Sequence, residues 1–338
     1  MHARTEAAVS YKIRRAALDE QIRIATVAHN LLGRLVEGAN GGRVLGALYG
    51  DMAHRTRAVA QVPNAVLAVR EAAQRGIGLY VAGIHADFEV ACRDLLTDAL
   101  EFWESCFTPV LGNVKPPPGA VSALAKRGWA GTITEALRSE SAADGFLRSC
   151  YALLRIKASN DDFAFLPLFD FFRRCRNRII HQDGTAGNDL VEFTKSKEVQ
   201  KTFQSLGASV RRMSPELPAL RATDRILLTP SHAILFLVVT LNLFNALESR
   251  VRSQLTEDGY LRMTAHYAYG CSHHPFRQKY YKNVLNPAYG FLRDRYVVRG
   301  LNKNNIIPQF KRLGLWDPMV VRFNELYSPT RHFNKAPR

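Results

Sequence analysis

Apolar residues recur at three- and four-residue steps along most of this chain, the spacing that gathers them on one face of an α-helix. The clearest example runs from Tyr11 to Val36. Further helices are expected over residues 43–74, 79–107, 121–139, 142–157, 161–181 and 230–254. No alternating pattern of convincing length indicates a strand. The sequence therefore predicts an all-α fold.

Glycines and a shift in composition divide the predicted helices into three segments. Gly76 and Gly78 precede the helix expected over 79–107, and Gly259 follows the long apolar helix. We therefore expect an N-terminal helical extension over 1–76, a helical bundle over 77–257 and a basic, aromatic-rich C-terminal helical region over 258–338.

The chain is strongly basic, with 46 Lys and Arg against 30 Asp and Glu and a net charge of +16. A field of this sign attracts polyanions, which favours nucleic acid or an anionic membrane as the partner. The alternative is a soluble protein that is merely basic and has no such partner. The excess is concentrated in 258–338, which holds fourteen basic residues, four acidic ones and eight of the twelve tyrosines.

Cysteine usage and the absence of targeting signals indicate a cytoplasmic protein. The five cysteines are scattered and include no C-x-x-C pair, which argues against a zinc ribbon or a disulfide framework. The N-terminal residues contain no apolar core typical of a signal peptide. The apolar run from Ala233 to Leu247 is shorter than the roughly 20 residues that span a bilayer, so we expect a buried core helix and no membrane partner.

The segment from Leu168 to Gly184 carries the most informative chemistry. Its apolar residues fall near helical spacing, which leaves its arginines and its histidine for other faces. Asn177 and His181 are four residues apart and therefore neighbours on one side of a helix. An imidazole beside several guanidinium groups suits RNA cleavage without a metal, because histidine transfers protons near neutral pH and arginine holds phosphate oxygens.

Each residue of this cluster has an expected role. His181 would transfer a proton, Arg176 would bind and stabilise the scissile phosphate, and Asn177 would orient one of them. The neighbouring arginines would bind substrate; they are Arg173, Arg174 and Arg178. No cofactor and no metal are expected.

Arg176, Asn177 and His181 match the commonest ribonuclease motif of the HEPN superfamily, Arg-Asn followed by three residues and His, and the segment resembles that family. Gln182-Asp183-Gly184 is similar to the polar exit after that histidine, and Phe88-Glu89 to an element of a preceding helix. The resemblance covers roughly 77–257. It implies a HEPN-like bundle, an endoribonuclease acting on tRNA or single-stranded RNA, and a homodimer with its two motifs facing each other. It further implies a toxin of bacterial defence with a regulatory protein partner.

Other interpretations stay open. The loose Arg-to-His spacing also occurs at Arg23–His29 and Arg225–His232, and many such bundles only bind nucleic acid or dimerise. A helical subunit that binds a nucleotide or a protein is a third class. A metal cluster is a weaker interpretation of Cys271, His273 and His274, with His266 nearby. No second ligand pair with the usual zinc spacing follows them. His85 is typical of a structural helix histidine, but would join the site if helix 79–107 packs on the motif helix.

Two surfaces are expected outside the motif. In 258–338, basic residues lie beside aromatic ones such as Tyr280, Tyr281, Tyr296 and Trp316, which suits docking of unpaired RNA, although a solvated basic domain has the same composition. The docking cations would be Lys279, Lys282, Arg293 and Arg295. The Phe and Ile side chains of the motif helix are the expected homodimer interface.

Overall fold

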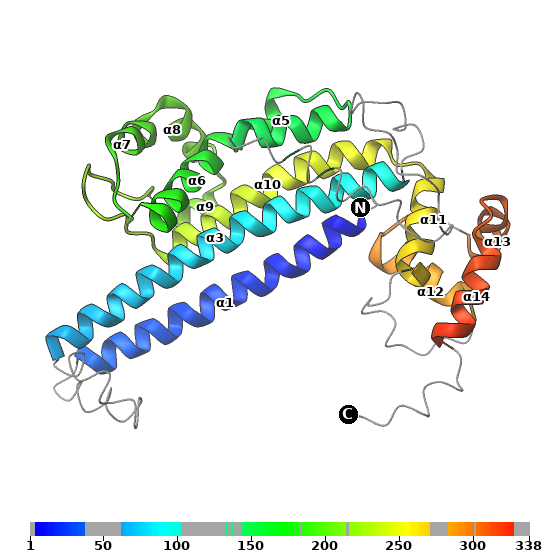
Figure 1. Cartoon of the computed structure of the whole chain (residues 1–338), viewed down its shortest axis with the longest axis horizontal. Helices are drawn as coiled ribbons and strands as arrows, with labels where there is room; N and C mark the ends of the chain where they lie inside the picture. Colours follow the sequence, from blue (N-terminus) through cyan, green and yellow to red (C-terminus); the bar gives the residue numbers. More distant parts are fainter. Residues whose placement is uncertain are drawn as a thin grey trace. The chain divides into compact units, whose positions relative to one another are not determined.

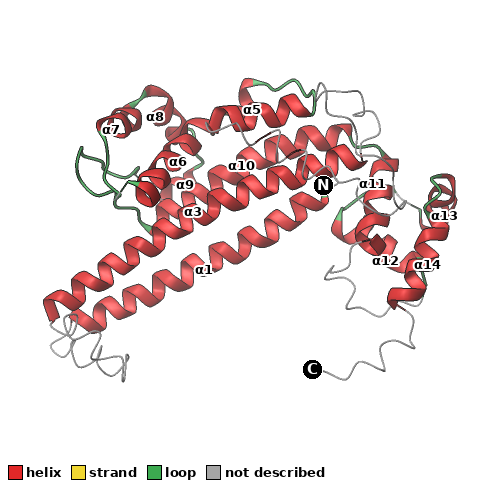
Figure 2. Ribbon diagram, in the orientation of Figure 1, coloured by secondary structure: helices red, strands yellow, loops and turns green. Residues whose placement is uncertain are grey.

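The computed structural model describes residues 4–37, 62–102, 133, 137, 143–182, 184–213, 216–270, 283–300 and 302–327. These residues are mostly helical (Figures 1 and 2). Within them the β pairing is one isolated bridge, between Thr185 and Arg225. The predicted all-α fold is confirmed.

The chain forms two compact units, and each is discontinuous in sequence. Unit 1 comprises residues 1–12, 89–159 and 244–338, and unit 2 comprises residues 13–88 and 160–243. The three consecutive segments predicted from the sequence do not coincide with these units. The predicted boundary at residue 76 lies inside a single helix, α3 (Val62–Phe102), because Gly76 and Gly78 do not interrupt it.

Unit 2 contains the motif. Its elements are α1 (Glu6–Glu37) from Ile13 onward, α3 up to Phe88, a short 3-10 turn (Asn160–Phe163), α6 (Leu166–His181), α7 (Asn188–Lys195), α8 (Lys197–Gln204), α9 (Ala208–Met213) and the first part of α10 (Pro230–Gln254). In this unit α1 runs alongside α3, where Arg14 forms an ion pair with Asp87 (Figure 1). Ile22 of α1 is buried, whereas Ile24, Val27 and Leu31 are exposed, so part of the apolar periodicity of this helix does not reach the core.

Close packing of α6 explains one of the three glycines of α3, which are Gly76, Gly78 and Gly83. A Cβ atom built on Gly78 would lie 2.8 Å from Cγ2 of Ile179, whereas one on Gly76 would meet nothing within 4 Å. Gly78 therefore allows α6 to pack directly against α3, at a position where the sequence alone predicts a break.

Unit 1 is built around the start of α1. Its other elements are the end of α3, α5 (Ala143–Leu153), the end of α10, α11 (Glu257–Ala265), a π-helical turn (His266–Gly270), α12 (Leu285–Gly290), a second π-helical turn (Phe291–Arg295), α13 (Lys303–Arg312) and α14 (Trp316–Tyr327). The backbone N–H groups of Thr5 and Ala7 donate to Glu248 and Asp98, at 3.2 and 3.0 Å. Buried carboxylates thus satisfy the first donors of α1, which have no partner within the helix.

Among the described helices, α10 alone is long and apolar enough to cross a membrane by length and composition. Its side chains at Phe236, Val239 and Leu247 are buried inside the protein. The core helix of a globular unit passes the same test, so this helix is weak evidence for a membrane segment.

Candidate functional site

Local sequence sets both ends of α6, the helix that carries the motif. Pro167 lies in the first turn, where its missing N–H costs no intrahelical bond. At the other end the backbone N–H groups of Gln182 and Gly184 both donate to the carbonyl of Arg178, at 2.9 and 3.0 Å. Gly184 has a φ of +72°, a left-handed conformation that favours glycine. The helix therefore ends directly after His181; Asp183 of the predicted polar exit lies outside the described residues.

The apolar side of α6 is buried within unit 2. The ring of Phe169 lies 5.0 Å from that of Phe88 and 5.7 Å from that of Phe236, between ring centroids. Phe171 and Phe172 are also fully buried. These phenylalanines are therefore not available to the predicted homodimer interface, because they are buried within the unit; the homodimer itself stays a prediction. Ile180, beside His181, remains 40% exposed.

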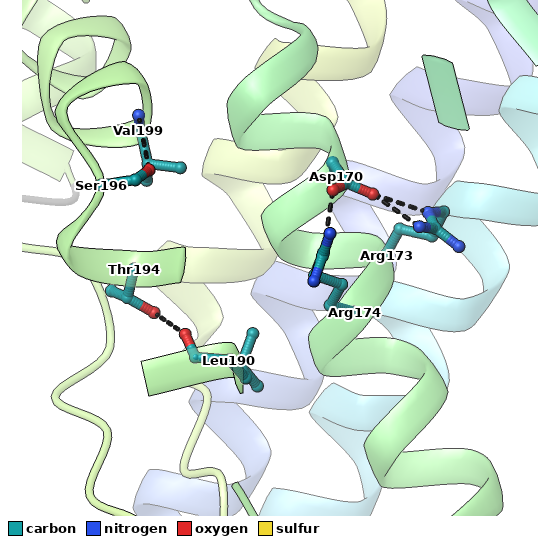
Figure 3. A network of polar contacts seen from close by, with 7 residues as sticks. All are labelled: Asp170, Arg173, Arg174, Leu190, Thr194, Ser196 and Val199. Carbon is teal, nitrogen blue, oxygen red and sulfur yellow. Dashed lines mark hydrogen bonds and ion pairs between the residues drawn. The ribbon is translucent and has the colours of Figure 1, made fainter. Parts of the chain in front are cut away.

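Carboxylates neutralise the arginines that were predicted to bind phosphate. Asp170 accepts hydrogen bonds from Nε and Nη2 of Arg173, at 2.9 and 2.6 Å, and from Nε of Arg174 at 2.8 Å (Figure 3). Arg174 also lies over the ring of Phe193, 4.2 Å from its centroid. Nη2 of Arg178 donates to Asp189 at 2.6 Å. Sequence analysis missed both acids, although Asp170 stands three and four residues before its partners, the spacing of neighbours on a helix.

Arg176 and Asn177 are brought together by the structure. Nη1 of Arg176 donates to the side-chain oxygen of Asn177 at 2.8 Å. The Nε atom of Arg176 is buried and has no hydrogen-bond partner among the described residues. The pair lies on the half-buried part of α6, one turn before its end.

His181 is exposed at the last position of α6. It lies five positions after Arg176, which places the two side chains about 140° apart around a regular helix. No hydrogen bond or ring contact joins His181 to another described residue. The structure therefore leaves the imidazole accessible to solvent and does not bring it onto the guanidinium group of the same chain.

His85 packs directly beneath the motif. Its ring stacks on that of Phe169 with 5.3 Å between centroids, so α3 does pack on the motif helix. Burial, reinforced by the positive charges of Arg176 and Arg173, lowers the pKa of His85 to about 4. His85 is consequently neutral at physiological pH and is buried behind the motif, as a structural histidine would be.

Two of the C-terminal residues predicted to dock RNA, Arg295 and Tyr296, are buried. Arg295 is buried and its Nε donates to Glu6 at 2.6 Å, while Tyr296 beside it is fully buried. Burial alone would lower the pKa of Arg295, but hydrogen bonding and attraction to Glu6 raise it overall. Arg293 is exposed and binds the adjacent Asp294 through Nε at 2.6 Å. Lys279, Lys282, Tyr280 and Tyr281 lie outside the described residues.

No cluster of three or more His, Cys, Asp or Glu side chains suited to a metal occurs within the described residues. His266 is buried against the rings of Phe102 and Tyr267, and Cys271, His273 and His274 lie outside the described part. The second loose motif match ends at His232, which is also buried and binds the backbone of Thr229 and Glu216.

No protein-family model, curated protein or solved structure matches this chain.

Proposed function

We propose that this protein is a metal-independent endoribonuclease whose site lies at the end of α6. The observation that carries the proposal is the exposure of His181 on a helix fixed from behind by a buried aromatic cluster, with the bonded pair Arg176 and Asn177 one turn before it. A rigid helix holds a proton-transfer group at a constant place, and an exposed one can reach a long substrate.

The chemistry requires two proton transfers. The ribose 2′-oxygen attacks the adjacent phosphorus, and the bond to the 5′-oxygen of the next nucleotide breaks, which leaves a 2′,3′-cyclic phosphate and a 5′-hydroxyl. A base removes the proton of the 2′-hydroxyl and an acid protonates the departing 5′-oxygen. His181 would perform one transfer, and Arg176 would stabilise the charge that develops on the phosphorane.

A homodimer would supply the second proton-transfer group. Ile180 and His181 are adjacent and exposed at the end of α6. Two copies meeting through this end would place two histidines beside one phosphate, without using the buried phenylalanines.

The paired arginines still have donors to offer to RNA. Within the described residues, Arg174 donates to Asp170 through Nε alone, and Arg178 donates to Asp189 through Nη2 alone. A guanidinium has five N–H donors, so both groups retain donors for phosphate oxygens. The HEPN resemblance adds further proposals: a cytoplasmic defence toxin that acts on tRNA or single-stranded RNA and that a partner protein restrains.

Cleavage of RNA by the purified full chain in EDTA tests the proposal. His181→Ala should lower the rate by about 10²- to 10⁴-fold, the contribution of a general acid or base. Arg176→Lys should also be inactive, because an ammonium group lacks the bidentate fork. Gln182→Ala, at the exposed neighbour of His181, is the matched control and should cleave at the wild-type rate.

The competing function is a nucleic-acid-binding module without catalysis. Its support is the same set of arginines, which bind phosphate whether or not His181 acts. RNA binding with no cleavage by the wild-type protein would favour this module and reject the enzyme.

A further inference from the structure

A cavity of about 600 Å³ lies in unit 2, apart from the motif residues. Its walls come from α7, α8, α9 and the segment 216–221. This volume falls in the range of sites that hold small organic molecules, roughly 300 to 1,000 Å³. None of Arg176, Asn177 and His181 lines it.

The lining is cationic, and its positive charge is not neutralised internally. Lys195, Arg211 and Arg221 line the cavity and are exposed. None of the three forms an ion pair with a described residue, in contrast to the arginines of α6. Among the described residues of the lining, Glu216 is the one acid. Such an excess favours an anionic ligand.

The remaining lining combines apolar and amide groups. Phe203, Val191 and Leu217 supply apolar surface, and the Phe203 side chain is buried. Gln200 and Gln204 supply amides, which donate and accept hydrogen bonds. An apolar wall with amides suits a flat, polar-edged ring, whereas inorganic phosphate would use only the cations.

Hydrogen bonds fix two walls of the cavity. The side-chain amide of Gln200 donates to the carbonyl of Thr194 at 2.7 Å, which ties α8 to α7. At the segment 216–221 the Nε2–H of His232 donates to the carbonyl of Glu216 at 3.1 Å, while its Nδ1 accepts from the N–H of Thr229 at 3.0 Å. The site is thus held in shape without a ligand, which lowers the entropic cost of binding.

We propose that this cavity binds a nucleoside monophosphate, with the phosphate on Arg211, Arg221 and Lys195 and the base on Phe203 between the two glutamines. The proposal does not depend on the ribonuclease activity, since the two sites share no residue.

Titration calorimetry of the full chain with AMP, GMP, CMP and UMP tests the site. At least one nucleotide should bind with a stoichiometry of one per chain. The corresponding nucleoside and inorganic phosphate should each bind at least tenfold more weakly, because each lacks half of the recognised groups. Arg211→Gln and Arg221→Gln should each lower affinity about tenfold, the usual loss for a charge-assisted hydrogen bond.

Matched controls separate this site from general positive charge and from the motif. Arg212→Gln alters the next residue of α9, which is exposed but does not line the cavity, and should leave affinity within twofold of wild type. His181→Ala should bind normally. Failure of all four nucleotides to bind at millimolar concentration, or equal losses in Arg211→Gln and Arg212→Gln, would overturn the proposal. Phosphate that binds as tightly as the best nucleotide would overturn it too.

Discussion

The motif helix α6 and the C-terminal segment 283–300 have similar arginine-rich, aromatic-rich sequences, yet the structure uses their arginines differently. On α6, Arg174 and Arg178 are half-buried, and each engages a carboxylate through one nitrogen. In the C-terminal segment, Arg295 is buried and binds Glu6 through two nitrogens. The difference shows that positive charge available to a ligand depends on where the neutralising acid lies, and a count of arginines does not reveal it.

The largest effect is expected from breaking the buried ion pair between Arg295 and Glu6. Arg295→Gln leaves the carboxylate of Glu6 buried without its cation and should lower the free energy of unfolding by about 3–5 kcal/mol. Arg293→Gln, two positions away and exposed, should change it by less than about 0.5 kcal/mol. Urea unfolding of both variants checks the contrast. Equal stabilities would mean that Arg295 does not occupy the core.

Acidification tests the packing of buried His85 of α3 against Phe169 of α6. The pKa of His85 is about 4 in the folded state against 6.5 in the unfolded chain. Between pH 4 and pH 6.5 the unfolded chain therefore holds a proton on this histidine that the folded protein lacks. The stability contributed by neutral His85 is complete above pH 6.5 and is lost as the pH falls toward 4. Between pH 7.5 and 5 the loss should reach about 2 kcal/mol.

His85→Gln should remove this share of the pH dependence. His232 also has a lowered pKa, mainly through burial, and contributes in the same direction in both proteins. The measurement is therefore the difference between wild type and variant in urea unfolding at the two pH values. An unchanged pH dependence would contradict the placement of His85 under Arg176.

Much of the architecture could be predicted from the sequence, because helical periodicity and start signals are local. The long apolar helix expected over 230–254 is α10, which begins at Pro230 and ends at Gln254. The helix expected over 161–181 begins later, at Leu166, because residues 160–163 form a separate 3-10 turn.

Partners distant in sequence could not be predicted. Glu6 and Arg295 are 289 residues apart, and no local pattern links them. The same limit applies to α1, where periodicity predicts an apolar face but not whether another helix covers it. At the site, the sequence predicted which residues lie near the end of α6, and missed Asp170 and Asp189 as their neutralising partners.

A smaller effect is expected from removing a carboxylate of α6. Asp170→Asn withdraws the negative charge shared by Arg173 and Arg174, so RNA should bind up to about tenfold more tightly. The logarithm of the binding constant should also fall more steeply with the logarithm of the salt concentration, by roughly the slope of one phosphate contact. Asp161→Asn makes the same change of net charge at an exposed residue that forms no ion pair with these arginines. Equal salt slopes for the two variants would place RNA away from α6.

The ends of RNA cut by the purified protein in EDTA test the assignment of His181 most directly. Transfer to the ribose 2′-oxygen should give 2′,3′-cyclic phosphate and 5′-hydroxyl ends with the wild-type protein, and none above background with His181→Ala. The same ends at the same rate from His181→Ala, or 5′-phosphate ends that appear only when Mg²⁺ is added, would contradict a metal-independent site at the end of α6.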